Sequence, residues 1–169
     1  MLYPMTILNG DYAKCEFTNI SFAGFGQNLD SGLKVIHNGK YNSTAINSKS
    51  ISKDGGICTF RSNIWVKSNA SKSKLNVSCD SLMLDSKSKS DTIPVDFIEI
   101  DDIEYAHEAK IGKISDDTIF YLMSRGISEE EAIKLIVRGF AEPISKAFPI
   151  EYAVEMNRLI DLELEGTIG

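Results

Sequence analysis

The sequence has no long apolar run and no targeting segment that would place it in or across a membrane. No run of about 18 apolar residues occurs, which is the length a membrane-spanning helix needs. The first residues, Met1-Leu2-Tyr3-Pro4, have neither the basic start nor the apolar core of a secretory signal. We therefore expect a cytoplasmic protein that makes no contact with membranes.

Cysteine is scarce and irregularly spaced. The three cysteines, Cys15, Cys58 and Cys79, form an odd set without a C-x-x-C pair. This pattern argues against a disulfide framework and against a closed zinc site, both of which need paired or clustered cysteines. At least one thiol should stay free.

Excess positive charge and a phosphate-binding loop are also missing. The net charge of -6 provides no long-range attraction to nucleic acid or to an anionic surface. The G-x-x-x-x-G-K-[ST] loop is absent, and the close pair Gly24 and Gly26 is too little to cradle a phosphate. Nucleic acid is therefore not an expected partner, and any effect of ATP should come through another protein.

The chain that remains is of ordinary folded composition, and its 169 residues suit one domain or a compact body with a small appendage. From about Leu8 to Glu104 it is rich in Ser, Asn, Lys and Thr, with short alternating segments that predict strands. The clearest of these are Leu33–His37, Thr44–Ser48, Ile57–Phe60, Asn63–Val66, Leu75–Leu84 and Val95–Ile100.

Many short strands fit a sandwich, a barrel or a β-solenoid. We favour a solenoid, because small polar residues such as Ser48, Ser50 and Ser52 alternate with modest apolar ones, as thin stacked coils require. Tight Asn-Gly hairpin signals are limited to Asn9-Gly10 and Asn38-Gly39.

Beyond Lys113 the pattern changes to helix start and stop signals. Ser115 can cap a helix that opens with Asp116-Asp117 and ends at Arg125-Gly126. We therefore divide the chain into a β core over residues 1–110 and a helical domain over residues 111–169.

Two further helices are expected in the tail. The run Ser128-Glu129-Glu130-Glu131 forms a capping box for a helix that should reach Arg138 and stop at Gly139. A last helix should cover about Ile150 to Glu163. The apolar stripes of these helices fit either an intramolecular core or a partner surface.

The residues with the most chemical potential are Cys79, in the segment Asn76–Leu82, and the pair His107-Glu108. A thiolate, an imidazole and a carboxylate that converge can hold a transition metal such as iron or zinc. Taken alone, each also has a simpler interpretation. Cys79 could be a small buried apolar residue, His107 a hydrogen-bonded structural residue, and Glu108 a solvated charge.

The helical stretch Ile111–Ala132, followed by Gly139-Phe140, resembles the C-terminal core of the SufB/SufD proteins, scaffolds of the SUF system for iron-sulfur cluster assembly. Further matching segments lie upstream in the family's order: Leu2–Pro4, Asp30–Gly32, Lys34–His37, Ser48–Ser52 and Phe60-Arg61. The resemblance thus covers nearly the whole chain. Of the two paralogues, the chain is more similar to SufB, which has a cysteine at the position of Cys79 and the His-Glu pair at the same separation.

This resemblance implies a mostly β protein with an α tail, namely a right-handed parallel β-helix followed by a helical segment. It also implies that Cys79 and Glu108 help to hold a nascent iron-sulfur cluster, with His107 beside them. The expected partners are the ATPase SufC, bound through the helical tail, and SufD or a second SufB, paired edge to edge with the β-helix. The chain would be a scaffold rather than an enzyme, because ATP hydrolysis would reside in SufC.

Two other functions are weighed against the scaffold. One is a SufD-like subunit that supports the complex without binding a cluster. The other is a β-solenoid enzyme that acts on polysaccharide, for which Asp101-Asp102 is the one candidate pair of adjacent aspartates in the β body. Adjacent residues on a strand point to opposite faces, which disfavours that pair as an acid and base.

Overall fold

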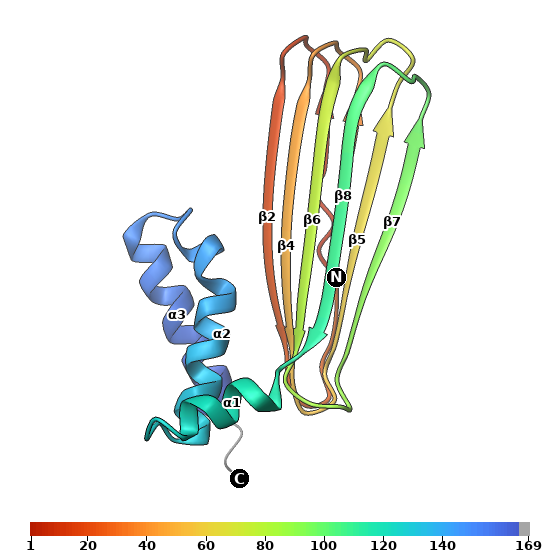
Figure 1. The fold of residues 1–169 in the computed structure, drawn as a ribbon. Coiled ribbons are helices and arrows are strands. Elements are labelled where there is room, and N and C mark those ends of the chain that lie inside the picture. Colours follow the sequence, from red (N-terminus) through yellow and green to blue (C-terminus); the bar gives the residue numbers. More distant parts are fainter. Residues whose placement is uncertain (166–169) are drawn as a thin grey trace.

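Residues 1–165, which the computed structural model describes, form a parallel β-solenoid followed by three helices (Figure 1). One sheet contains β1 (Met5–Leu8), β3 (Asn28–His37), β5 (Ile57–Val66) and β7 (Lys89–Ile98), in that order. The other contains β2 (Lys14–Ala23), β4 (Ser43–Ser52), β6 (Ser73–Met83) and β8 (Ile103–Lys113). The solenoid expected from the sequence is confirmed.

Each strand pairs in parallel with the strand two places later in the chain. Met5 lies opposite Lys34 and Lys14 opposite Ser43, so one coil takes about 30 residues. In residues 1–165 this order leaves free sheet edges at both ends of the solenoid, namely β1 and β2 in the first coil and β7 and β8 in the last.

The strands are longer than the alternating segments suggested. Ile57–Phe60 and Asn63–Val66 were expected as two strands but form the single strand β5. Arg61 continues the alternation, because its side chain points outward and forms an ion pair of 3.0 Å with Asp30 on β3. Arg61 therefore occupies an outward-facing position within a strand and does not mark a turn between two strands.

The interior between the two sheets is thin and mixes apolar with small polar side chains. Every second residue of β5 is buried, and the main apolar cluster includes Leu33, Val35, Ile46, Phe60, Ile64 and Val77. Ser48, Ser50 and Ser52 of β4 are buried on the same side, as the solenoid pattern predicted.

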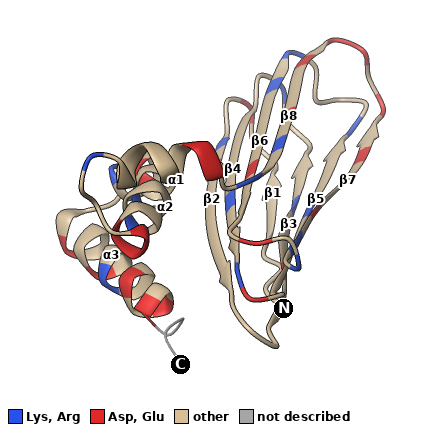
Figure 2. Cartoon of the chain, turned by 60° about the horizontal axis from the view of Figure 1, so that its bottom comes forward, with Lys and Arg blue, Asp and Glu red and all other residues tan. Residues whose placement is uncertain are grey.

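The helical tail contains α1 (Asp116–Met123), α2 (Glu129–Ser145) and α3 (Ile150–Glu165). Both expected N-caps are present, because the Ser115 hydroxyl accepts from the Thr118 amide and the Ser128 hydroxyl from the Glu131 amide, each at 3.3 Å. The first turn of α1 contains Asp116 and Asp117, and Figure 2 shows this acidic start of α1 close to the end of the sheet. These carboxylates lie near the positive end of the helix dipole.

The expectation that the second helix stops at Gly139 was wrong, since α2 continues to Ser145. Glycine costs only about 1 kcal/mol in a helix interior, and burial beyond it offsets this cost. Ala141 and Ile144, which follow Gly139, are almost completely buried.

The tail packs on the outer face of the sheet formed by β2, β4 and β6. A second apolar cluster joins Ile51 of β4 to Val137, Ala141, Ile160 and Leu164 of α2 and α3. The apolar stripes therefore form an intramolecular core, one of the two alternatives left open by the sequence. None of the helices formed by residues 1–165 is long and apolar enough to cross a membrane.

Candidate functional site

Cys79 lies in the middle of β6, and its side chain points into the solenoid. It is 2% exposed and belongs to the main apolar cluster. Burial, together with the neighbouring Asp80 carboxylate, raises the pKa of the Cys79 thiol to about 11. The thiol is therefore protonated at neutral pH, and a metal ion that binds it must displace the proton.

His107 reaches the same side of the sheet from β8. In the strand register it lies opposite Val77, and Cys79 lies opposite Ala109, so the imidazole and the thiol are diagonal neighbours facing the interior. The Nδ1 atom of His107 is 3.4 Å from the Tyr105 hydroxyl. Its Nε2 atom is buried and has no hydrogen-bond partner among the described residues.

Glu108 points away from these two residues. It follows His107 on a strand, so its side chain lies on the outer face, where it forms an ion pair of 3.0 Å with Lys110. The structure therefore brings Cys79 and His107 to one side of the sheet and leaves Glu108 on the other. Within residues 1–165, no three His, Cys, Asp or Glu side chains converge well enough to hold a metal ion.

Two residues next to His107 were missed by the sequence reasoning. The Tyr105 hydroxyl donates a 2.5 Å hydrogen bond to Oδ2 of Asp96, which reaches the interior from β7. Burial and the Asp96 carboxylate raise the pKa of Tyr105, so the phenol keeps its proton. Strand periodicity would have found Tyr105, which precedes His107 by two positions, whereas only the coil geometry brings Asp96 to it.

The other two cysteines are packing residues. Cys58 is buried, its thiol donates to the Ile51 carbonyl at 3.4 Å, and burial raises its pKa to about 11. Cys15 packs against the main apolar cluster. All three cysteines are free thiols.

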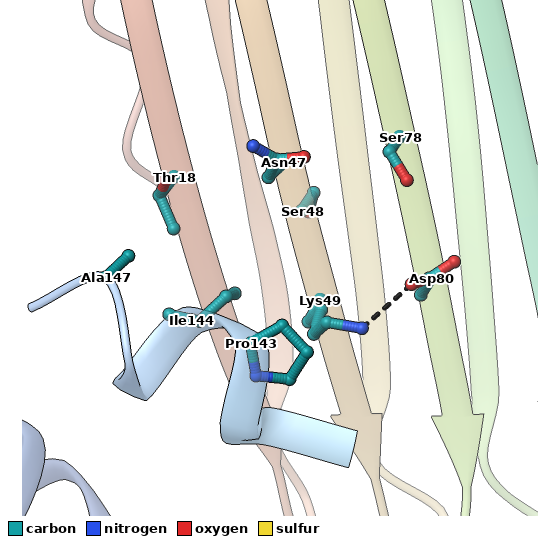
Figure 3. Close-up of a pocket in the computed structure, with 9 residues that line it drawn as sticks. All are labelled: Thr18, Asn47, Ser48, Lys49, Ser78, Asp80, Pro143, Ile144 and Ala147. Carbon is teal, nitrogen blue, oxygen red and sulfur yellow. Dashed lines mark hydrogen bonds and ion pairs between the residues drawn. The ribbon is translucent and has the colours of Figure 1, made fainter. Parts of the chain in front are cut away.

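A pocket of about 320 Å³ lies on the outer face, between the sheet and the C-terminal part of α2 (Figure 3). Its floor includes the Lys49–Asp80 ion pair, at 2.8 Å, and its wall includes Pro143 and Ile144. Ser78, also on the floor, is in register with Glu108 on the next strand. No thiol or imidazole lines this pocket, so it does not complete the metal-binding set.

The aspartates considered for a polysaccharide-cleaving site lie in the turn before β8. Asp102 forms an ion pair of 2.7 Å with Lys72, and nearby Glu104 forms one of 3.0 Å with Lys74. These carboxylates are engaged in surface ion pairs between neighbouring coils. They do not form the opposed acid and base that glycoside hydrolysis requires.

Comparison with known proteins agrees with this architecture. Residues 1–140 match the family model for the SufBD core domain of SUF system FeS cluster assembly. The chain is 52% identical over its full length to a SufBD family iron-sulfur cluster assembly protein of Staphylococcus saprophyticus and 52% identical to the iron-sulfur cluster assembly protein SufB of Bacillus subtilis. A SufBD family protein of Staphylococcus haemolyticus is 51% identical.

The chain spans 36% of the length of each of these relatives and corresponds to their C-terminal portion. The family-model match covers the solenoid, α1 and the greater part of α2, and it ends at Phe140, where the resemblance noted from the sequence also ends. The chain therefore belongs to the SufBD family of the SUF system for iron-sulfur cluster assembly.

Proposed function

We propose that this chain serves as a scaffold that holds a nascent iron-sulfur cluster as its cargo, with Cys79 and His107 as ligands from the solenoid interior. The observation that supports this best is the position of the two side chains. They face the same side from adjacent strands, next to the free edge of the last coil, and Nε2 of His107 has no hydrogen-bond partner within residues 1–165.

The ligand set suits a cluster that must later be released. Thiolate and imidazole bind iron, and two such ligands leave coordination positions for sulfide or for groups of another subunit. A cluster held by four thiolates would be retained more firmly. The incomplete set within residues 1–165 is thus compatible with transient holding.

Glu108 is the third proposed ligand, and its geometry sets a condition. Because its carboxylate lies on the outer face of β8, it can reach the same cluster as Cys79 only if the cluster straddles the free edge of that strand. Its ion pair with Lys110 must then open, which costs little because both side chains are about two-thirds exposed or more.

The partners are those that the resemblance to SufB implies, and the exposed surfaces offer places where they could bind. We propose that SufC, which would hydrolyse the ATP, docks on the helical tail, where Phe120, Tyr152 and Val154 expose large apolar side chains. We further propose that SufD or a second SufB pairs with the free edge of the solenoid. This assembly would work in the cytoplasm, where the three free thiols stay reduced.

A SufD-like supporting role is the second candidate. The observation that favours it is the outward orientation of Glu108, which leaves only two interior ligands. The two candidates differ in whether Cys79 is needed for a cluster.

The test is anaerobic reconstitution of the chain with ferrous iron and sulfide, alone and with its ATPase partner. Cluster absorption is compared among the parent, Cys79→Ala, Glu108→Gln and the matched control Cys58→Ala, which removes an equally buried thiol from another strand. We expect Cys79→Ala to lose the cluster, Glu108→Gln to weaken it and Cys58→Ala to keep it. Equal absorption in Cys79→Ala and the parent, or a cluster in neither, would favour the supporting role.

A further inference from the structure

A line of polar side chains crosses the interior of the last coil next to the proposed ligands. It runs from Asp96 on β7 through Tyr105 to His107 on β8. Polar groups at this depth need partners, because an unpaired buried polar atom costs free energy. The hydrogen bonds among these three side chains therefore indicate the role of Asp96 and Tyr105.

The direction of each hydrogen bond follows from chemistry. Asp96 is a carboxylate and can only accept, so the phenol hydrogen of Tyr105 goes to Oδ2 of Asp96. The phenol oxygen then has only lone pairs left for His107. The 3.4 Å hydrogen bond between the phenol oxygen and Nδ1 of His107 therefore has Nδ1 as its donor, so Nδ1 carries the ring hydrogen.

This direction determines the state of the other ring nitrogen. With the hydrogen on Nδ1, a neutral imidazole has a free lone pair on Nε2, which is the state that binds a metal ion. Nε2 of His107 is buried, and so is Oδ1 of Asp96 at the other end of the line. Neither atom has a hydrogen-bond partner in the described part of the chain.

Each end group of the line uses one polar atom in it, and its other polar atom has no partner among residues 1–165. The core residue His37 also has an unpartnered ring nitrogen, so an open nitrogen alone does not indicate a metal site. What distinguishes His107 is that it faces the same side of the sheet as the Cys79 thiol on the adjacent strand. Fixing a ring through its second nitrogen is how proteins orient metal-binding histidines.

We infer that Asp96 and Tyr105 are positioning residues, which hold the His107 ring in the tautomer with hydrogen on Nδ1 and keep Nε2 free for a metal ion. The inference deepens the proposed function and rests on it for the identity of the cargo. Neither residue needs to touch the metal.

The first test needs no metal. The chain has only two histidines, so ¹⁵N-labelled imidazoles give two ring systems, and buried His37, whose Nε2 is 2.8 Å from the Thr44 hydroxyl, is an internal reference. We expect a single Nδ1–H tautomer for His107 in the parent and a mixture in Tyr105→Phe. Tyr12→Phe, at an exposed position in the turn before β2, is the control and should give the parent spectrum.

The second test is cobalt(II) titration followed by absorption, with circular dichroism to confirm that each variant folds. Loss of an outer hydrogen-bond partner typically weakens metal binding by about 10-fold or more, and we expect this for Tyr105→Phe and for Asp96→Leu. Tyr12→Phe should bind cobalt(II) as the parent does.

The outcomes distinguish the positioning role of Asp96 and Tyr105 from the proposed scaffold function. An unchanged His107 tautomer in Tyr105→Phe, or unchanged cobalt(II) affinity despite a changed tautomer, would overturn the positioning role and leave the scaffold function standing. A parent chain that binds neither cobalt(II) nor a cluster would overturn the proposed function itself, while the tautomer spectra would still show whether the line holds the ring.

Discussion

At the scale of single residues, the two histidines differ in role. His107 is a proposed metal ligand, whereas His37 is a residue of the core. His37 is fully buried, bonds Thr44 through Nε2 at 2.8 Å and lies among core residues. Burial lowers the pKa of His37 to about 4. This histidine is therefore neutral in the folded protein and takes up a proton readily only after unfolding.

The sign of the resulting pH dependence follows directly. The pKa of His37 is lower in the folded protein than in the unfolded chain. Its titration therefore has little effect on the free energy of unfolding above about pH 6.5 and lowers that free energy as the pH falls toward 4. Between pH 7 and pH 5 this linkage costs about 2 kcal/mol. Urea unfolding at the two pH values should show the loss in the parent and a loss smaller by that amount in His37→Gln. Identical losses would contradict the assignment.

Only part of the candidate site could be predicted from the sequence. Cys79 and His107 were proposed from their residue types and from the resemblance to SufB. Strand alternation alone predicts that His107 and Glu108 face opposite sides. The pairing of Asp96 with Tyr105 could not be predicted in this way. It depends on two strands from different sheets meeting across the interior.

At the scale of elements, α2 shows why helix ends are hard to predict from local signals. Gly139 is a reasonable stop, but the burial of Ala141 and Ile144 against the rest of the fold extends the helix to Ser145. Tertiary packing of this kind outweighs the propensity of one residue. The caps Ser115 and Ser128 were predictable because their hydrogen bonds span only three residues.

The same position gives a stabilising substitution. No atom lies within 4 Å of a Cβ added at Gly139, and the site is inside α2, so Gly139→Ala should stabilise the protein by up to about 1 kcal/mol. Thermal and urea unfolding measure this gain. Gly32→Ala is the opposite case, because its Cβ would lie 2.1 Å from the Arg61 carbonyl oxygen, and it should destabilise the solenoid. A stability loss in Gly139→Ala would mean that the helix is interrupted there.

At the scale of the whole molecule, the solenoid and the helical tail have separate apolar clusters. The cluster inside the coils contains Val77 and Cys79, whereas the cluster beneath the tail joins Ile51 to Val137 and Ile160. The composition break near Lys113 was visible in the sequence. The docking of the tail on the outer face of β4 was not visible in the sequence. The outward-facing Ile51 lies among buried serines, and this pattern does not predict that a helix packs on that face.

Separate clusters predict that the tail can detach while the coils stay folded. Val137→Asp places an unpaired carboxylate at a fully buried position under α2, which should cost the docked tail about 3 kcal/mol or more. Leu135→Asp, on the same helix at a position 48% exposed, is the matched control. Hydrogen exchange should quicken in α2 and α3 of Val137→Asp alone and remain slow in the strands of both variants. If the strands exchanged faster as well, the coils would depend on the tail, and the proposed cluster ligands would depend on whatever docks there.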